Sequence, residues 1–161
     1  MKAGLVSSLL LVLLIACGAS PEDLRKEAQA KLDAGDPAAA LQLAETALKD
    51  PAIAANKADA WRFESIRLEG LARTSKGGVV ATELDRLAGS YSGQVTAALY
   101  RSVADKARAA GDNSGAIAIL EAGDKRFPAE KDSFAEAIQA INAAGGLDPA
   151  EIERLKALGY L

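Results

Sequence analysis

Apolar residues recur every three or four positions along successive segments of this chain, which predicts a series of amphipathic helices. The first two segments carry them at Leu24, Ala28 and Leu32, and at Ala40, Leu41, Ala44, Ala47 and Leu48. Ser20 and Pro21 precede the first segment as an N-cap and a first-turn residue. Gly35 suits a left-handed C-cap, and Pro37 suits the start of the next helix. We therefore predict two antiparallel helices joined by a tight turn.

A similar pair is predicted around Gly111 and Asp112. Its apolar and small positions are Tyr100, Val103, Ala104, Ala116, Ile117 and Leu120. Between the two pairs lies a less regular one, in which Gly77 is aligned with the turn glycines Gly35 and Gly111. Its apolar stripe, Val80, Leu84, Leu87 and Tyr91, then falls about two residues early, so the pattern predicts an irregular middle hairpin.

Two further helices are predicted at the end of the chain. The first has Phe134, Ala137, Ile138 and Ile141 at helical spacing and ends at Gly145 and Gly146. The second begins with Asp148 as N-cap and Pro149 in the first turn, and Gly159 ends it. Ile152, Leu155 and Leu158 are expected to face inward. These helices would cover the exposed edge of the preceding hairpin.

The small residues of the predicted hairpins resemble a tetratricopeptide repeat. In that family small residues stand at the eighth, twentieth and twenty-seventh positions, which Ala28, Ala40 and Ala47 match, and Gly35-Asp36 matches its turn. The resemblance covers residues 22–128 and implies an all-α fold: a short right-handed α-solenoid of about three helical hairpins. Residues 129–161 are predicted to form C-terminal capping helices.

The N-terminus has the pattern of a secretory signal. Lys2 supplies a positive start, and an apolar segment extends to Ala16, too short and too near the N-terminus for a membrane-spanning helix. The sequence at 14–17, Leu-Ile-Ala-Cys, resembles the lipobox of bacterial lipoproteins. That resemblance implies a signal peptide at 1–16, acylation of Cys17 and a lipidated tether at 17–21. The alternative is a short N-terminal anchor helix that is retained.

The lipoprotein resemblance also implies a location in the bacterial cell envelope. Gly18 stands where an aspartate commonly marks retention in the inner membrane, which favours the periplasmic face of the outer membrane. Cys17 is the only cysteine, so no disulfide is expected.

Composition excludes several function classes. The chain has no histidine and one cysteine, so Ser-His-Asp catalysis, Cys-His catalysis and a Cys-His metal site are excluded. Ser75-Lys76 and Ser102-Lys106 are the remaining candidate dyads, but such neighbours are common on helix surfaces. Acidic residues exceed basic ones, 22 to 19, so nucleic acid is not an expected partner. We predict a protein that is not an enzyme and that uses no cofactor or metal.

Arginines are the candidate binding residues. In the repeat alignment Arg25, Arg67 and Arg101 occupy the fifth place of each first helix, which implies a position on the concave, partner-binding face. Arg108 lies two turns beyond Arg101. A guanidinium group can pair with a carboxylate through two bonds, which suits recognition of an acidic segment. The alternative is that these arginines bridge neighbouring carboxylates in the same chain, such as Glu22, Glu64 and Asp105.

Three functions are compatible with this sequence. The favoured hypothesis is a membrane-anchored scaffold or adaptor that binds a protein or peptide and supports an assembly or secretion complex in the envelope. The second is a structural subunit of a permanent complex or of a self-assembled oligomer. The third is a lipoprotein that binds a small ligand or a polysaccharide, and the low aromatic content of 4% disfavours it because sugar platforms use stacking rings.

Overall fold

The computed structural model describes residues 20–74 and 76–161, and within these ranges every regular element is a helix. In chain order they are α1 (Pro21–Asp33), α2 (Pro37–Ala47), α3 (Pro51–Ala55), α4 (Lys57–Arg73), α5 (Gly77–Ser90), α6 (Ala97–Ala109), α7 (Asn113–Arg126), the short 3-10 helix η1 (Pro128–Glu130), α8 (Lys131–Ala143) and α9 (Pro149–Ala157). The predicted all-α class is confirmed. The predicted signal peptide and Cys17 lie outside the described residues.

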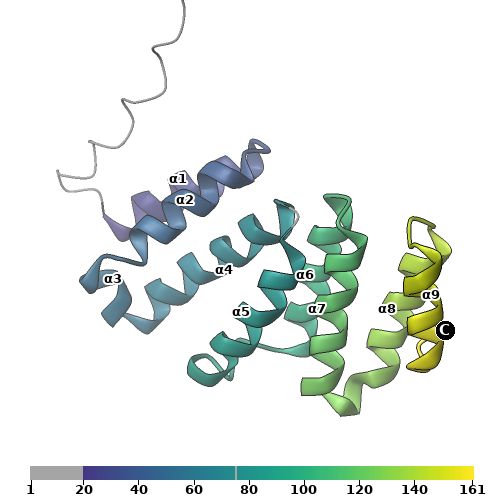
Figure 1. Ribbon diagram of the computed structural model, residues 1–161. Helices are drawn as coiled ribbons and strands as arrows, with labels where there is room; N and C mark the ends of the chain where they lie inside the picture. The colour runs from purple at the N-terminus through teal and green to yellow at the C-terminus, as the bar shows by residue number, and fades with distance from the viewer. Residues whose placement is uncertain (1–19, 75) are drawn as a thin grey trace, which may run out of the picture.

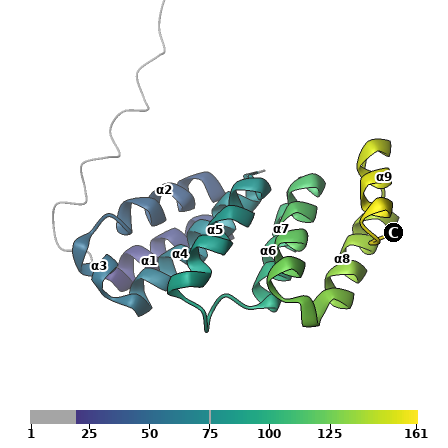
Figure 2. The same ribbon diagram turned by 60° about the horizontal axis from the view of Figure 1, so that its bottom comes forward.

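The helices stack in chain order, from α1 and α2 at one end to α8 and α9 at the other (Figure 1). Helices α1, α4, α6 and α8 pack each against the next and form one layer. Helix α2 packs on α1 and α4, whereas α7 packs on α5, α6 and α8. The view in Figure 2 shows the same progression, with the short α3 at the α1–α2 end. Each helix therefore contacts mainly its neighbours in the stack.

Two buried apolar clusters hold the stack together. The smaller one joins α1, α2, α3 and the first half of α4, and is built from Ala28, Leu32, Ala40, Ala44, Ala47, Ile53, Phe63 and Ile66. The larger one extends from α4 to the C-terminus and includes Leu68, Tyr100, Ile117, Phe134 and Ile138. Helix α4 contributes side chains to both clusters, so it links the first hairpin to the rest of the molecule.

Local signals set the helix ends where the sequence predicts them. The side chains of Ser20, Asp36, Asp112 and Asp148 each accept a hydrogen bond from a backbone N–H in the first turn of the helix that follows. These bonds satisfy N–H groups that a helix leaves without an intrahelical partner. Gly35 has φ +78° in the first interhelical turn, a left-handed conformation that suits the end of a helix.

The middle hairpin differs from its prediction. In the outer hairpins the turn glycine stands two residues before the second helix, as Gly35 does before Pro37, whereas Gly77 is itself the first residue of α5. Equivalent turn bonds support this register, because Asp36 N–H donates to Lys31 O and Lys76 N–H donates to Leu71 O. The alignment of Gly77 with the turn glycines is therefore wrong by two residues.

The corrected register accounts for the apolar stripe that looked out of place. Val80 now matches Ala40 and Ala116 of the outer hairpins, and all three are fully buried. Leu84 and Leu87 match Ala44 and Ala47 in the same way. The second helix of the middle hairpin is therefore regular.

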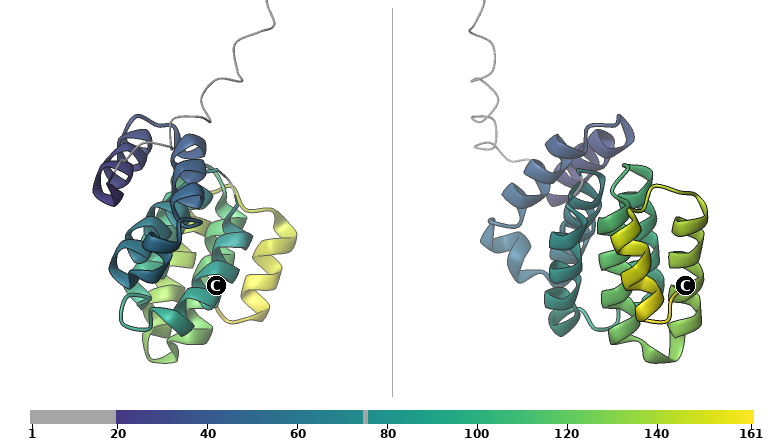
Figure 3. Two further views of the ribbon diagram at one scale, coloured as in Figure 1. Left: turned by 90° about the vertical axis from the view of Figure 1, so that its left-hand side faces the viewer. Right: turned by 45° about the vertical axis from the view of Figure 1, so that its right-hand side comes forward.

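The C-terminal helices continue the stack. Phe134, Ile138 and Ile141 of α8 are buried against the larger cluster, as predicted. Helix α9 lies at the end of the row, beside α7 and α8 in both views of Figure 3. Leu155 is fully buried, but Leu158 is 52% exposed, so its predicted inward position is wrong.

Candidate functional site

Two pockets open along the layer formed by α1, α4 and α6. The first, of about 390 Å³, lies between α1 and α4 and is lined by Glu22, Arg25, Gln29, Trp61, Arg62, Ser65, Ile66 and Glu69. The second, of about 540 Å³, lies between the α1–α2 turn, the end of α4 and α6, and is lined by Gly35, Pro37, Arg73, Ser102, Asp105, Lys106, Ala109 and Ala110. We call these two pockets together the α1–α4–α6 groove.

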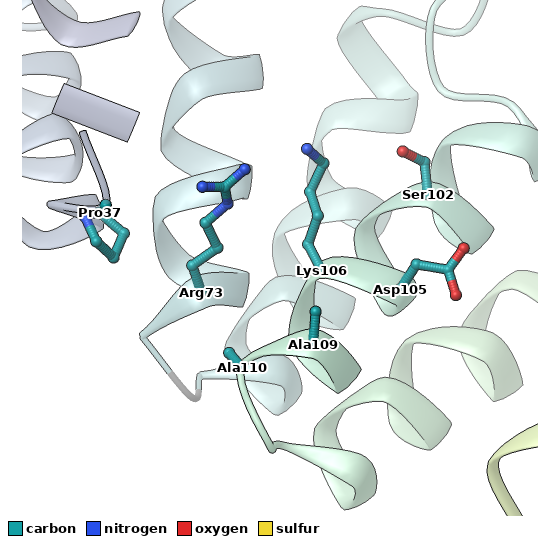
Figure 4. Close-up of a pocket in the computed structure, with 8 residues that line it drawn as sticks. Pro37, Arg73, Ser102, Asp105, Lys106, Ala109 and Ala110 are labelled. Atoms are coloured by element: carbon teal, nitrogen blue, oxygen red, sulfur yellow. The ribbon is translucent and has the colours of Figure 1, made fainter. Parts of the chain in front are cut away.

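Glu69 connects the two pockets. Its side chain lines the first pocket and pairs with Arg73 and with Lys106 Nζ, the latter at 2.6 Å, both of which line the second. Figure 4 shows Arg73 of α4 and Lys106 of α6 extending in the same direction, with Pro37 across the pocket. Arg73 is further held by a 3.1 Å bond from its Nη1 to Leu32 O. Two cations thus share one carboxylate at the centre of the groove.

Arg25 lies at the α1 end of the groove and is bound to a carboxylate of its own helix. Its Nε and Nη2 donate to the two oxygens of Glu22 at 3.0 and 2.7 Å. This bidentate bond, with added attraction from Lys26 and Arg62, lowers the pKa of Glu22 from 4.5 to about 2. Arg25 therefore lines the groove as half of an ion pair with Glu22.

Trp61 lines the same pocket and also serves the core. Its ring lies 5.1 Å from that of Tyr91, centroid to centroid, at an interplanar angle of 40°. Trp61 also packs on the edge of the larger apolar cluster. The indole is held in place by this packing and presents its remaining surface to the groove.

Arg67 is not in the groove, which corrects its predicted position. The groove residue Ser65 is two positions away, and residues two apart on a helix point to different faces. Arg67 points toward α5, where it pairs with Glu64 at 2.7 Å and with Glu83. The error follows from the register of the middle hairpin: the residue equivalent to Arg25 is Ser65.

Arg67 belongs to a closed ring of four charges between α4 and α5. Arg86 completes it through bonds of 2.9 Å to both Glu64 and Glu83. Arg67 is only 13% exposed and Glu64 is buried. Burial raises the pKa of Glu83, but hydrogen bonds from Arg67 and Arg86 outweigh it, so the net shift is downward. The ring joins two helices of one hairpin, and each of its charges pairs with opposite charges of the same ring.

Arg101 and Arg108 also pair within the chain. Arg101 Nη1 donates to Glu130 at 3.1 Å and to Ser133 Oγ, and its guanidinium lies 5.6 Å from the Phe134 ring centroid. Arg101 thus connects α6 to the start of α8. Arg108 lies 3.8 Å from Asp105 on the same helix. The carboxylates that the sequence suggested as alternative partners, Glu22, Glu64 and Asp105, are the ones that Arg25, Arg67 and Arg108 contact.

The structure reveals three groove cations that the repeat alignment did not select: Arg62, Arg73 and Lys106. Arg62 could have been found in the sequence, because it lies one helical turn before Ser65. Ser65 is the residue equivalent to Arg25 when the loop between α4 and α5 is placed correctly. Arg73 and Lys106 depend on how α4 and α6 lie side by side, which spacing within either helix does not specify.

Charge in the groove differs in sign from that of the whole chain. Its lining holds four cations, Arg25, Arg62, Arg73 and Lys106, against three carboxylates, Glu22, Glu69 and Asp105. The chain as a whole has a formal net charge of −3. Such a local excess attracts acidic groups. In residues 20–74 and 76–161 no cluster of His, Cys, Asp and Glu has the composition of a metal site.

Comparison with known protein families, with characterised proteins and with solved structures gives no match to this chain. Within the described part of the chain, none of the helices combines the length and the hydropathy that crossing a bilayer requires. The helical stack and its groove are therefore the features on which a functional argument rests.

Proposed function

We propose that this protein is a lipid-anchored, helical-repeat scaffold of the bacterial cell envelope whose α1–α4–α6 groove binds an acidic segment of a partner protein. The lipobox-like sequence ending at Cys17 supports the anchor, and the stacked hairpins support the scaffold. Stacked helical hairpins present extended surfaces that suit peptides better than compact small ligands.

The choice of an acidic partner rests on the carboxylate of Glu69, which two cations share. Arg73 and Lys106 both pair with this one group, and Asp105 of the same pocket lies 3.8 Å from Arg108, so these three cations exceed the two carboxylates by one positive charge. Arg73 and Lys106 are partly exposed at their pocket, with side-chain exposures of 36% and 30%. A carboxylate entering there would gain charge-assisted hydrogen bonds without displacing Glu69. The neighbouring Pro37, Ala109 and Ala110 supply an apolar wall for the adjoining part of the segment.

A matched pair of double variants tests this proposal. Arg62→Gln with Lys106→Gln removes two groove charges, and Lys49→Gln with Lys131→Gln removes two exposed charges elsewhere. The probe is a short labelled peptide of alternating alanine and glutamate, titrated by fluorescence anisotropy at several salt concentrations. Hydrogen bonds to charged groups contribute about 1.5–3 kcal/mol, so the groove variant should bind about tenfold more weakly or worse, with a smaller salt dependence.

The control variant should keep its affinity, and a peptide with lysine in place of glutamate should not bind the wild type. Equal binding by both double variants would show that the groove is not the site. Failure of the acidic peptide to bind at all, with intact helical structure by circular dichroism, would also contradict the proposal. Envelope pull-downs with the same three proteins would then identify the natural partner by its loss in the groove variant alone.

A further inference from the structure

Four polar side-chain bonds attach helix α9 and the residues after it to the rest of the molecule. Glu151 accepts from Ser114 Oγ at 2.9 Å, and Arg154 Nη1 donates to Glu121 at 2.6 Å. Tyr160, just after α9, donates to Asp124 at 2.6 Å. Its backbone oxygen accepts from Gln139 Nε2 at 3.0 Å. These bonds come from both α7 and α8, so α9 and the residues after it span the two helices (Figure 3).

Helix α9 itself buries few apolar side chains. Within it only Leu155 is buried, with Ile152 half-buried and Leu158 52% exposed. The flanking residues add the buried Tyr160 and the half-buried Leu147 and Leu161, which contact the larger cluster. A nine-residue helix that buries so little depends on its polar bonds for its position. Such peripheral elements open at lower free energy than the core to which they attach.

The connection between α8 and α9 can act as a hinge. It contains Gly145 and Gly146, with φ of +79° and +95°, in a left-handed region that other residues avoid. Asn113 Nδ2 donates to Gly146 O at 3.4 Å, a long bond that restrains the segment weakly. Fully extended, residues 144–148 would span about 17 Å, enough to carry α9 onto a neighbouring molecule whose α8 lies against this edge.

We propose that the face of α7 and α8 beneath α9 is a docking site that accepts the same segment, residues 147–161, from a second copy of the chain. The bonds that position α9 would all re-form between molecules, since each copy carries both halves of every pair. Exchange of an identical element is a low-cost route to a dimer. The result would be a reciprocal dimer joined at the C-terminal ends of two stacks.

Charge reversal across the Glu121–Arg154 pair tests the exchange. In the Glu121→Lys variant, the new lysine faces Arg154, both within one chain and in an exchanged dimer of two identical variant chains. In the Arg154→Glu variant, the new glutamate faces Glu121 in both arrangements. The two variants are then co-expressed with different tags. In an exchanged mixed dimer, one half pairs the two substituted side chains, which have opposite charges. The other half pairs the unchanged Glu121 of one chain with the unchanged Arg154 of the other. Capture on one tag should then recover the other form about tenfold more than in either single-variant co-expression.

The double variant Glu121→Lys with Arg154→Glu restores the pair within one chain and is the control for the charge change itself. Mixed-tag recovery no greater than that of the single variants would overturn the proposal, provided that both fold by circular dichroism. If either fails to fold, a labelled peptide of residues 147–161 provides the second measurement. It should bind the full chain carrying Tyr160→Phe, whose own segment is held by one bond fewer, and absence of binding would overturn the proposal equally.

Discussion

At the scale of single residues, Gly77 shows how a small residue can be required by a distant neighbour. A Cβ atom at this position would overlap the backbone of Gly115 in α7, so α5 and α7 approach each other with no side chain between them. Asp112 strengthens the contact, because its carboxylate accepts from Gly77 N–H at 3.0 Å and from Gly115 N–H at 2.8 Å. One aspartate thus caps α7 and fixes the start of α5.

Gly77→Ala should therefore destabilise the protein by about 1–3 kcal/mol, because the new methyl group forces two backbones apart. Gly78 is the matched control: nothing lies within 4 Å of a Cβ built there. Gly78→Ala should be neutral or stabilising by about 0.4–1 kcal/mol, through the lower entropy of the unfolded chain. Urea unfolding followed by circular dichroism measures both. Equal effects of the two substitutions would contradict the close approach of α5 and α7.

At the scale of the helical elements, the charge ring between α4 and α5 replaces part of the apolar contact found in the other hairpins. The two helices of this hairpin pack less extensively on each other than α6 does on α7, whereas α5 packs closely on α7. The ring places Glu64 and Arg67 where little solvent reaches them. Removing Arg67 would leave Glu64 and Glu83 with Arg86 as the one remaining cation of the ring, so two carboxylates where little solvent reaches would be only partly compensated.

Arg67→Met should lower the free energy of unfolding by about 1–3 kcal/mol at neutral pH. Because the pKa of Glu83 is lowered in the folded state, its stabilising contribution is complete above its unfolded pKa, near 4.5, and is lost as the pH falls through the lower folded value. The difference between wild type and variant should thus narrow below about pH 4.5. Urea titrations at pH 7 and at several acidic values measure it. A difference independent of pH would show that packing, not charge, holds this side chain.

At the scale of the whole molecule, the proposed anchor and the described fold are separable. The single cysteine of the chain is Cys17, and the described helices begin at Pro21. The two apolar clusters of the described residues are built from Leu24 and residues that follow it, and the proposed lipidation site lies outside the described residues. Attachment and folding should therefore respond independently to mutation.

Cys17→Ser should block processing and abolish incorporation of labelled fatty acid, while leaving the melting temperature of the helical part unchanged. Several acyl chains hold a protein durably at about 0.8 kcal/mol per buried methylene, so their absence removes the lipid contribution to membrane attachment. Ser20→Ala, which removes the N-cap of α1, should do the reverse: it should keep the lipid and cost about 1 kcal/mol of stability. Recovery of an unlipidated wild type would contradict the proposed anchor.

The sequence by itself determined the longer helices and most of their ends, because these depend on residues close together in the chain, whereas the short α3 and η1 were not predicted. Ser20, Asp36, Asp112 and Asp148 cap helices through bonds to N–H groups within the next few residues, and Gly35 ends a helix through its own backbone conformation. The periodic burial of α6 and α8 follows from their own apolar spacing in the same way. Such local interactions can be inferred from spacing alone.

Only the tertiary structure decided the register of the middle hairpin and the composition of the groove. Gly77 resembles a turn glycine in the sequence, but its small size serves a contact with Gly115, far along the chain. That contact moves the turn, places Ser65 in the groove and directs Arg67 toward Glu83. Likewise, Arg73 and Lys106 meet at Glu69 because α4 and α6 pack side by side. These contacts join residues distant in sequence, so helical periodicity within one segment carries no information about them.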